Sequence, residues 1–477
     1  MKHLFIGGEW RLPTGSETIT VVSPSTEEPV GQAPLSARED VDAAVAAANA
    51  ALTSGDWSTW SAGERAEAME RFADALESRA TETARLVTAE NGMPIAVSGP
   101  VEGLGPAGVL RYFARLARDT AWEQPRPAAS GRGTTVVRRE PVGVVAAVLP
   151  WNFPQSLAMF KLAPALAAGC AVVLKPAPET SLDAFQFAEA AQEAGLPAGV
   201  LNVVTGGPET GAYLVAHPGV HKVAFTGSTE AGRTIAEICG RLLRPVTLEL
   251  GGKSAAIVLN DADLAATVRG LAWASLLNSG QTCYVSSRIL APRTRYDEVV
   301  EAVAELARSL PVGDPADPAT RVGPLVSARQ RERVETAIAK GRAQGARIAT
   351  GGGRPAGLTR GWFVEPTVFA EVDNSFALAQ EEIFGPVLAV IPYDDESHAV
   401  GIANDSPFGL AGTVWTSDEE RGLDLARRMR TGSVGVNFYA IDLGAPFGGV
   451  KASGLGRELG PEGLEAYVSY KSVYLRK

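Results

Sequence analysis

The sequence predicts an α/β protein with a doubly wound domain that is followed by a second α/β domain. Short runs rich in valine, which are typical of buried strands, alternate with segments whose apolar residues recur at helical spacing. This alternation occurs in two sets, one before about residue 252 and one after it. Strands that alternate with helices in this way form parallel sheets covered by helices.

The elements of both sets follow from these patterns. In the first set, helices are expected over residues 39–53, 62–90, 181–194 and 229–241, and strands over 143–149, 171–175, 200–204 and 222–225. In the second set, strands are expected over residues 285–291, 363–369, 387–393 and 433–437, and helices over 295–309, 327–344 and 417–430.

Two segments fit neither set. Residues 123–141 are polar, contain Pro and Gly, and lead into a strand pattern over 134–139. The tail, 466–475, alternates apolar and polar residues as a half-exposed strand does. Isolated strands need partners, so we predict that these pair at an oligomer interface.

Charge and hydropathy exclude several classes of protein. The chain has 477 residues, enough for about two to four domains, and a net charge of −10, which argues against a nucleic-acid surface. Residues 1–10 lack the apolar run of a signal peptide, and no apolar stretch approaches the roughly 20 residues that span a bilayer. We expect a cytoplasmic protein with no nucleic-acid or membrane partner.

The three cysteines are Cys170, Cys239 and Cys283, too few and too widely spaced for a disulfide scaffold. No Cys/His cluster indicates zinc, and no metal site is expected. We interpret Cys170 and Cys239 as buried apolar thiols. A reducing compartment suits a protein that keeps a free thiol at Cys283.

Two glycine patterns are candidates for phosphate binding. Residues 103–108 match GxGxxG, but no strand precedes them, so they are interpreted as a glycine-rich helix start. Residues 225–232 follow a strand and open a helix, where Gly227 lets the backbone approach a phosphate and the first N–H groups of the helix point at it. A plain strand-to-helix turn with Ser228 or Thr229 as N-cap explains the same pattern.

Polar side chains also follow two predicted strands, where α/β proteins place ligands. Asn152 could donate a hydrogen bond to an oxyanion, or belong to a simple Pro-Asn turn. Lys175 could reach a ribose or phosphate, or extend along the surface to water.

A carboxylate and a thiol complete the candidate chemistry. Glu249 lies in an apolar run before a double glycine, where desolvation would raise its pKa towards the range of a general base. Cys283 follows a glycine turn; a lone cysteine is usually structural. With only four histidines in the chain, glutamate is the more economical partner for a nucleophilic thiol.

The residues of these motifs and their order along the chain resemble those of the aldehyde dehydrogenase superfamily across essentially the whole chain. The motifs that carry the resemblance are at residues 150–154, 175–176, 225–228, 248–253, 280–283, 381–387 and 446–449. The resemblance implies that Cys283 is the nucleophile and that Asn152, with the backbone N–H of Cys283, forms the oxyanion hole. It also implies that Glu249 activates water against the thioester.

The resemblance assigns cofactor contacts as well. Lys175 and Ser228 would contact the adenosine ribose and the pyrophosphate, and Trp151 is a further candidate contact. Glu382 would hold the nicotinamide ribose, with Phe384 packed near that end of the cofactor.

The expected cofactor is NAD, with NADP as an alternative. Many NAD-preferring members carry a glutamate where this chain has Pro178, and that glutamate repels a 2′-phosphate. Glu179 lies next to it in the sequence and is a candidate cofactor contact.

The family fold comprises a Rossmann-like cofactor domain, a catalytic domain and a small β oligomerisation arm. Residues 1–121 and 142–251 would form the first, 252–455 the second, and 122–141 with 456–477 the arm and C-terminal strand. Members are dimers or tetramers, so a homo-oligomer, expected as a homotetramer, is implied.

The substrate pocket implied by the resemblance is apolar and aromatic. Its candidates are Phe153, Leu157, Phe160, Tyr284, Phe438, Tyr439 and Phe447, with Tyr112 as a further one. No arginine stands among them to pair with a second carboxylate, so we expect an apolar aliphatic, terpenoid or aromatic aldehyde. The chain departs from many family members at two places near this pocket. It has Val285 where alanine is common, and residues 437–446 are one residue shorter than in some relatives.

Two other functions remain open on the sequence. An acylating dehydrogenase would pass the acyl group to coenzyme A, but it would not need Glu249. A non-catalytic protein on the same scaffold would not need Cys283, Asn152 and Glu249 together.

Overall fold

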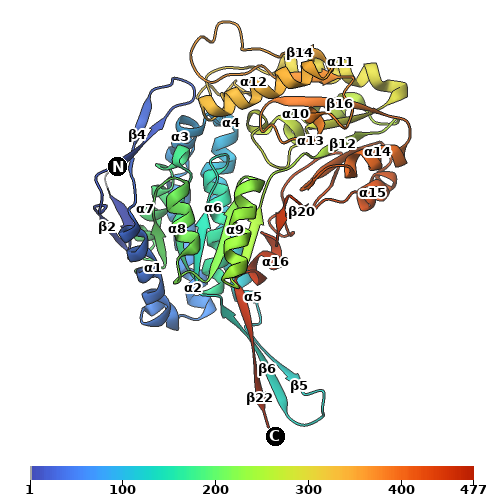
Figure 1. The fold of residues 1–477 in the computed structure, drawn as a ribbon. Helices are drawn as coiled ribbons and strands as arrows, with labels where there is room; N and C mark the ends of the chain where they lie inside the picture. The colour runs from blue at the N-terminus through green and yellow to red at the C-terminus, as the bar shows by residue number, and fades with distance from the viewer. Residues whose placement is uncertain (1–2, 477) are drawn as a thin grey trace.

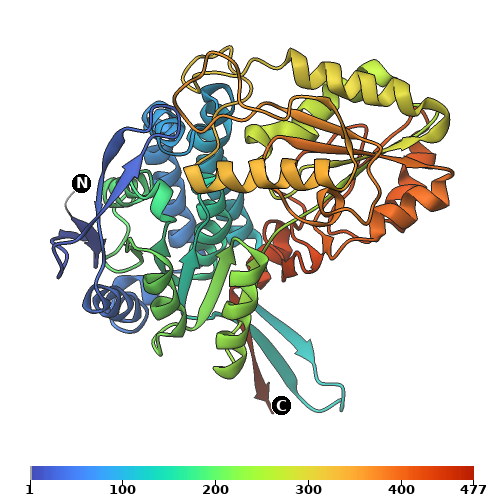
Figure 2. The same ribbon diagram turned by 45° about the horizontal axis from the view of Figure 1, so that its top comes forward.

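The computed structural model describes residues 3–476, which form two helix-covered sheets and a protruding arm (Figure 1). Met1, Lys2 and Lys477, which belong to the predicted cofactor domain and arm, lie outside the described residues. The two units lie side by side, the N-terminal one on the left of Figure 2 and the unit after residue 252 on the right.

The first sheet has eight strands in the order β2-β1-β9-β8-β7-β10-β11-β21. From β9 to β11 the strands run parallel, and β1 and β21 flank them in antiparallel pairing. The chain moves outward from β7 to β8 and β9, then returns to the other side of β7 with β10, so the order reverses between β7 and β10. That reversal is the point at which doubly wound sheets bind ligands.

The strands of this sheet are β1 (Leu4–Ile6), β2 (Glu9–Arg11), β7 (Val144–Val148), β8 (Ala171–Lys175), β9 (Leu201–Val203), β10 (Lys222–Thr226), β11 (Val246–Glu249) and β21 (Gly454–Leu455). The parallel strands β7, β8, β9 and β10 are buried at every position, which explains their continuous apolar runs. A separate hairpin pairs β3 (Thr18–Val22) with β4 (Pro29–Pro34).

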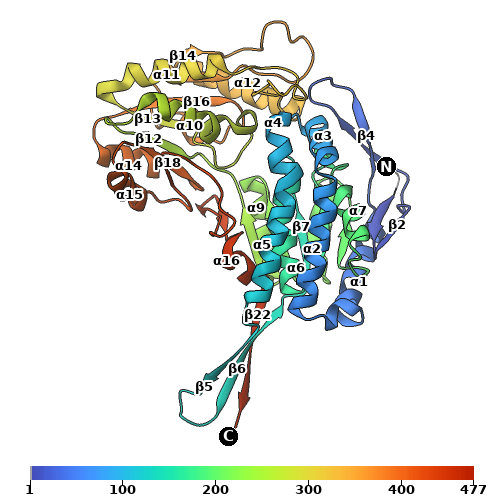
Figure 3. The same cartoon turned by 180° about the vertical axis from the view of Figure 1, so that it is seen from behind.

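Helices cover both faces of the first sheet. Helices α8 and α9 cover one face (Figure 1), and α2, α5 and α6 cover the other (Figure 3). The helices of this unit are α1 (Arg38–Thr53), α2 (Ala62–Ser78), α3 (Ala80–Asn91), α4 (Ile95–Ser98), α5 (Gly105–Asp119), α6 (Pro154–Ala168), α7 (Phe185–Glu193), α8 (Pro208–Ala216) and α9 (Thr229–Arg241), with short turns η1 (Asp56–Thr59), η2 (Gly99–Leu104) and η3 (Pro178–Thr180).

The single helix expected over residues 62–90 is two helices. Arg79 leaves helical geometry, with φ −97° and ψ 0°, between α2 and α3. Its side chain donates to Ala75 O at 3.1 Å and to Glu193 Oε2 at 2.5 Å, contacts that the helical spacing of the sequence does not report. Residues 103–108 span the end of η2 and the start of α5, which confirms the glycine-rich helix start.

The second sheet has seven strands in the order β14-β15-β16-β13-β12-β18-β19, all parallel except β14. Its strands are β12 (Ala255–Val258), β13 (Arg288–Pro292), β14 (Arg347–Thr350), β15 (Thr367–Ala370), β16 (Val387–Tyr393), β18 (Gly412–Trp415) and β19 (Gly435–Val436). Its helices are α10 (Leu264–Leu276), α11 (Tyr296–Ser309), α12 (Ala328–Ala343), α13 (Ala377–Gln380), α14 (Glu396–Asn404) and α15 (Glu419–Arg428), with turns η4 (Leu277–Gly280) and η5 (Arg293–Arg295).

Three expected strands of this sheet begin later than predicted, among them the strand expected over 433–437, which is β19 and begins at Gly435. Residues 285–287 belong to the turn after Cys283, and β13 begins at Arg288. Strand β15 begins at Thr367 because the preceding residue is Pro366, which has no N–H to donate to a neighbouring strand.

The C-terminal segment returns to the first unit and then forms the arm. Strand β20 (Val450–Lys451) pairs with β17 (Phe408–Gly409), and α16 (Gly460–Glu465) precedes the last strand. The arm is one sheet of β22 (Val468–Leu475), β6 (Thr134–Pro141) and β5 (Glu123–Pro127), so the two stray segments find partners in each other (Figure 1). Within residues 3–476, no helix is both long and apolar enough to cross a bilayer.

Candidate active site

A groove of about 910 Å³ lies along the carboxyl edge of the first sheet, and Cys283 is among the residues that line it. Strand ends, helices α8 and α9, and helix α12 of the second unit form its walls. The predicted site residues that line it are Trp151, Asn152, Lys175, Gly227, Ser228, Cys283, Glu382 and Phe384. The residues predicted from separate motifs therefore meet at one cavity, at the switch point of the sheet.

The glycine turn after β10 has both of the properties considered for it. Ser228 Oγ accepts a hydrogen bond from Ala231 N at 3.3 Å and so caps α9, whose first turn faces the groove. A Cβ added at Gly227 would lie 2.5 Å from the ring of Phe225. Only glycine fits there, and it leaves the helix N-terminus open to an anionic group.

Lys175 ends β8 and is buried. Its Nζ donates to Pro176 O at 2.8 Å, and burial lowers the pKa of its ammonium to about 8, partly opposed by the charge of Glu179. Glu179 lies close enough to act on Lys175 but is not among the residues that line the groove.

The loop before Cys283 is held in an unusual backbone conformation. Three consecutive residues, Asn278, Ser279 and Gly280, have φ values of 49°, 56° and 73°. Asn278 Nδ2 donates to Asn152 O at 3.0 Å, and Ser279 Oγ donates to Gly323 O at 3.0 Å. Left-handed backbone at non-glycine residues is costly and persists where the surroundings fix it, which is common at functional sites.

Asn152 is bound directly to this loop. Its Nδ2 donates to Gln281 O at 3.0 Å, two residues before Cys283. A side-chain amide has two N–H donors, so one hydrogen serves this bond and the other is available to an acceptor in the groove.

The thiol of Cys283 lies in a field of negative charge. Burial raises its pKa most, and the nearby carboxylates of Glu382 and Glu249 raise it further. The thiol, rather than the thiolate, is therefore favoured until a positive charge enters the groove.

Glu249 ends β11 and is 2% exposed. Neither of its oxygens has a hydrogen-bond partner among the described residues, and an added Cβ at Gly448 would lie 2.6 Å from Oε1. Burial and the charge of Glu458 raise the pKa of Glu249, opposed by Lys161 and Arg457. An unpaired buried carboxylate of this kind is a candidate for proton transfer.

Glu458 has a partner of its own. Its Oε1 forms a buried ion pair with Lys161 Nζ at 2.8 Å, 297 residues away in the sequence. Sequence reasoning missed this pair because each residue alone looks like an ordinary surface charge.

Glu382 and Phe384, two residues apart in the sequence, both line the groove. Glu382 Oε1 accepts from Gly252 N at 2.8 Å, and an added Cβ at Gly251 would lie 2.5 Å from its Oε2. Trp151 and Phe384 form an edge-to-face pair with ring centroids 5.3 Å apart. Arg329, Gln330 and Arg333 of α12 also line the groove, although the helical pattern of that segment gave no sign of it.

Three of the aromatic pocket candidates pack against one another around Tyr284, the residue after Cys283. Tyr284 stacks on Tyr439 at 4.9 Å and meets Phe447 edge-on at 6.4 Å. The hydroxyls of Tyr439 and Ser433 share a 2.7 Å hydrogen bond. The remaining buried or half-buried candidates are Phe153, Leu157, Phe160 and Tyr112. Phe438 is 62% exposed and lies at the surface.

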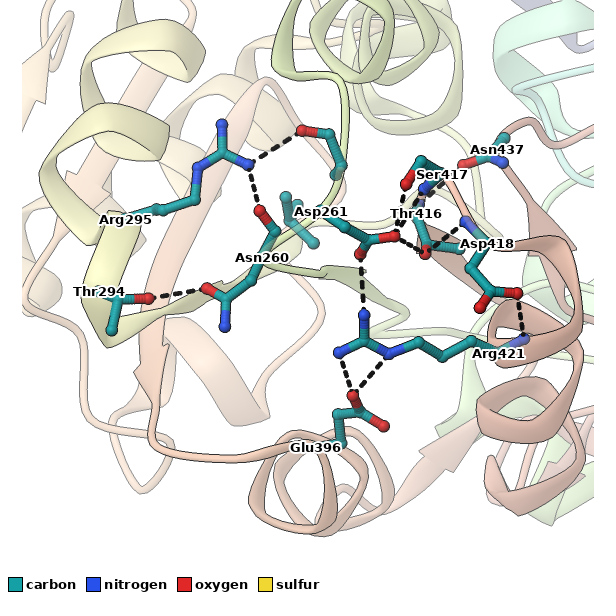
Figure 4. A network of polar contacts seen from close by, with 12 residues as sticks. Asn260, Asp261, Thr294, Arg295, Glu396, Thr416, Ser417, Asp418, Arg421 and Asn437 are labelled. Carbon is teal, nitrogen blue, oxygen red and sulfur yellow. Dashed lines mark hydrogen bonds and ion pairs between the residues drawn. The ribbon is translucent and has the colours of Figure 1, made fainter.

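A second polar cluster occupies the carboxyl ends of the second sheet (Figure 4). Asp261 follows β12 and accepts hydrogen bonds from Thr416 and Ser417, while Arg421 pairs with both Asp261 and Glu396. None of these residues lines the groove. Their polar groups are used within the protein.

A groove at the switch point of a doubly wound sheet, lined by a glycine turn at a helix N-terminus and by Cys283, is typical of an enzyme that binds a dinucleotide. A model of the aldehyde dehydrogenase family matches residues 10–473. The chain is 56% identical to a geranial dehydrogenase of Castellaniella defragrans, over 99% of this chain and 98% of that protein. It is 43% identical to a 3-succinoylsemialdehyde-pyridine dehydrogenase of a Pseudomonas species, over 99% and 98%.

Solved structures agree with this match. An aldehyde dehydrogenase of Mycobacterium tuberculosis, crystallised with NAD+, superposes with a TM-score of 0.97 at 51% identity, covering 99% of this chain and 98% of that one. The chain belongs to the aldehyde dehydrogenase family. The family, the α/β fold class and the enzyme class expected from the sequence are confirmed.

Proposed function

We propose that this enzyme oxidises an aldehyde to its carboxylic acid through a thioester on Cys283. One observation carries the proposal: Cys283 and Asn152 line one groove, Asn152 is bonded to the loop two residues before Cys283, and the charge of Glu249 raises the pKa of the thiol. The sulfur, the amide and the carboxylate come from three separate parts of the chain, at positions 283, 152 and 249.

Each of the three side chains has one task. The thiol of Cys283 loses its proton to solvent and the resulting thiolate attacks the aldehyde carbon, while Asn152 and the backbone N–H of Cys283 donate to the oxygen as it gains charge, one donor contributing about 3–4 kcal/mol. NAD, when bound, supplies the acceptor for the hydride that leaves this adduct. Glu249 then takes a proton from the water that attacks the thioester, and the acid departs as the sulfur is released.

The groove has the features that a dinucleotide requires. The capped N-terminus of α9 and the glycine turn at Gly227 suit a pyrophosphate, and the half-buried carboxylate of Glu382 suits ribose hydroxyls. Lys175 and Trp151 complete the proposed contacts. We propose NAD as the cofactor. NADP is the alternative, because Pro178 supplies no charge to repel its 2′-phosphate and Glu179 does not line the groove.

The proposed substrate is an apolar aldehyde of the terpenoid, aliphatic or aromatic kind. The stacked rings of Tyr284, Tyr439 and Phe447 beside the thiol support this class. The name of the geranial dehydrogenase points the same way, whereas the Pseudomonas relative is named for an aromatic semialdehyde.

An aldehyde panel with NAD and with NADP tests the proposal. We expect geranial, octanal and phenylacetaldehyde to give the acid, with kcat/KM at least tenfold above that of succinic semialdehyde. Coenzyme A is added in a parallel arm. A coenzyme A thioester as the main product, or cofactor binding without turnover of any aldehyde, contradicts the proposed reaction; a preference for succinic semialdehyde contradicts the substrate class alone.

We also propose a cytoplasmic homo-oligomer, a dimer or tetramer, joined through the arm. Strand β5 is exposed at every position, and Tyr470, Tyr474 and Leu475 of β22 are exposed apolar side chains. Light scattering on the intact protein and on a variant that ends at Glu465 measures the mass; an unchanged mass would place the interface elsewhere.

A further inference from the structure

Phe384, which lines the groove and packs against Trp151, has a backbone conformation that large residues rarely adopt. Its φ is 60°, in the left-handed region, which costs on the order of 1–3 kcal/mol for a residue other than glycine. The turn directs Phe384 against Trp151 and sets the course of the chain from Glu382. The surrounding protein must therefore hold this turn in place.

Helix α12 holds it through three successive carbonyl groups. Arg333 Nη2 donates to Glu382 O at 2.7 Å, and Gln330 Nε2 donates to Ile383 O at 3.1 Å and to Phe384 O at 2.8 Å. Gln330 and Arg333 are three residues apart and so share one face of the helix. Gln330 is only 8% exposed. Water could not easily take the place of its two hydrogen bonds, so their loss would be costly.

The start of the same helix is tied to the loop that carries Cys283. Gln281 Oε1 accepts from Val326 N at 3.0 Å, and Ser279 Oγ donates to Gly323 O at 3.0 Å. Ser327 caps α12 by accepting from Gln330 N at 3.1 Å. We call residues 323–333, which touch the thiol loop at one end and residues 382–384 at the other, the brace.

We propose that Gln281 and Gln330 are positioning residues. Through the brace, they fix the separation between the sulfur of Cys283 and the segment at Glu382 and Phe384, where the nicotinamide end of the cofactor would bind. Neither side chain takes part in bond formation. Hydride transfer needs its reacting atoms within about 3–3.5 Å, and a displacement of about 1 Å can cost 100-fold in rate. The inference rests on the proposed function, because it concerns the hydride step of that reaction.

The brace predicts that hydride transfer and acyl chemistry respond differently to one substitution. An activated ester acylates Cys283 directly and is then hydrolysed with the help of Glu249, with no hydride transfer. Loss of the bonds from Gln330 leaves those two residues in place and disturbs only the segment at Glu382 and Phe384. Ester hydrolysis therefore reports the thiol, and aldehyde oxidation reports the thiol and the brace together.

The variant Gln330→Met keeps the size of the side chain and removes both donors. We expect kcat for aldehyde oxidation to fall at least tenfold, KM for NAD to rise, and the isotope effect with a 1-deuterated aldehyde to increase, because hydride transfer becomes limiting. Hydrolysis of 4-nitrophenyl acetate without cofactor should stay within twofold. The control is Gln344→Met at the C-cap of the same helix; the Oε1 of Gln344 accepts from Ala377 N at 3.0 Å, away from the groove.

Two further variants sharpen the test. Gln330→Glu offers a donor to the carbonyl groups only when protonated, so its activity relative to wild type should recover as pH falls. Gln281→Met combined with Gln330→Met should lose less than the product of the single effects, because both act through one brace.

The outcomes separate the two proposals. Wild-type protein that neither oxidises aldehydes nor hydrolyses the ester contradicts the proposed function. Active wild-type protein together with a Gln330→Met variant that keeps its kcat and isotope effect, or loses ester hydrolysis in the same proportion, overturns the brace. Fully multiplicative effects of the two glutamine substitutions overturn the link through residues 323–333.

Discussion

The carboxyl ends of the two sheets are built alike and used differently. On the first sheet, Glu249 is the last residue of β11, neither of its oxygens has a hydrogen-bond partner among residues 3–476, and its pKa is raised by burial. On the second, Asp261 follows a buried strand; burial raises its pKa, but the hydrogen bonds that it accepts from Ser417 and Thr416, among others, outweigh burial and lower the pKa to about 2 (Figure 4). A strand end becomes a reactive site where its polar side chains are left unsatisfied by the protein.

Removal of the thiol from the groove along the first sheet should have the largest effect on aldehyde oxidation. Cys283→Ala should lower aldehyde oxidation by at least about 10⁴-fold, because no other group can form the covalent adduct. Titration with NAD by fluorescence and thermal melting should show binding and stability close to wild type. Cys239→Ala, the matched control at a buried thiol outside the groove, should keep full activity. Turnover by Cys283→Ala within tenfold of wild type would exclude the thioester route.

Glu249→Gln comes next, and it should separate the two halves of the reaction. Rapid mixing should show one equivalent of reduced NAD per active site, followed by steady turnover slowed by about 10²–10⁴-fold because water is no longer deprotonated. Absence of the burst in a folded variant would mean that Glu249 also acts before thioester formation.

The wild-type deacylation step should carry the pH dependence of the same carboxyl. Burial raises the pKa of Glu249 above the usual value for glutamate, and only the ionised form accepts a proton from water. Steady turnover should therefore fall up to about tenfold per pH unit on the acid side of that raised pKa, while the burst amplitude stays near one. An acid limb that persists unchanged in Glu249→Gln would assign the titration to another group.

Asn152→Ala tests the amide at the end of β7. Loss of one oxyanion donor should lower kcat by about 10²–10³-fold with a small change in KM. The matched amide on the second sheet is Asn260, whose Oδ1 accepts from Thr294 Oγ1 at 2.7 Å outside the groove. Asn260→Ala should leave kcat within twofold; equal losses in the two variants would remove the distinction between the strand ends.

Much of the fold could be predicted because burial leaves a direct mark on the sequence. Residues 171–175, 229–241 and 387–393 are elements with the expected bounds, since valine-rich runs and helical spacing report strands and helices buried in the core. Strands β12 and β18 and helices α10 and α14 were not predicted. Strands β12 and β18 are only four residues each, too short for periodicity to separate them from their surroundings.

The candidate site divides in the same way. Cys283, Asn152 and Glu249 could be singled out because each has a polar group beside a turn in an apolar setting. Gln330 and Arg333 could not, because their helix is polar on most positions and their partners lie 49–54 residues away in the sequence. Contacts of that kind depend on how the elements pack, which local patterns do not encode.

Asp261→Asn is the smallest expected change and the one that completes the comparison. The amide keeps the shape of the carboxylate and one acceptor oxygen for Ser417 and Thr416, but those hydrogen bonds lose their charge and Arg421 loses an ion-pair partner, so the free energy of unfolding should fall by about 1–3 kcal/mol while kcat stays within twofold. The folded-state pKa of Asp261 is depressed from the usual aspartate value of 3.8 to about 2, so its contribution is complete above about pH 4 and is lost as pH falls towards 2. Urea unfolding at pH 7 and at pH 3 measures this: the stability difference between wild type and variant should shrink at the lower pH. A difference that is the same at both values would assign the stability to packing around residue 261, and a loss of activity would show that the second sheet's carboxyl ends also serve the reaction.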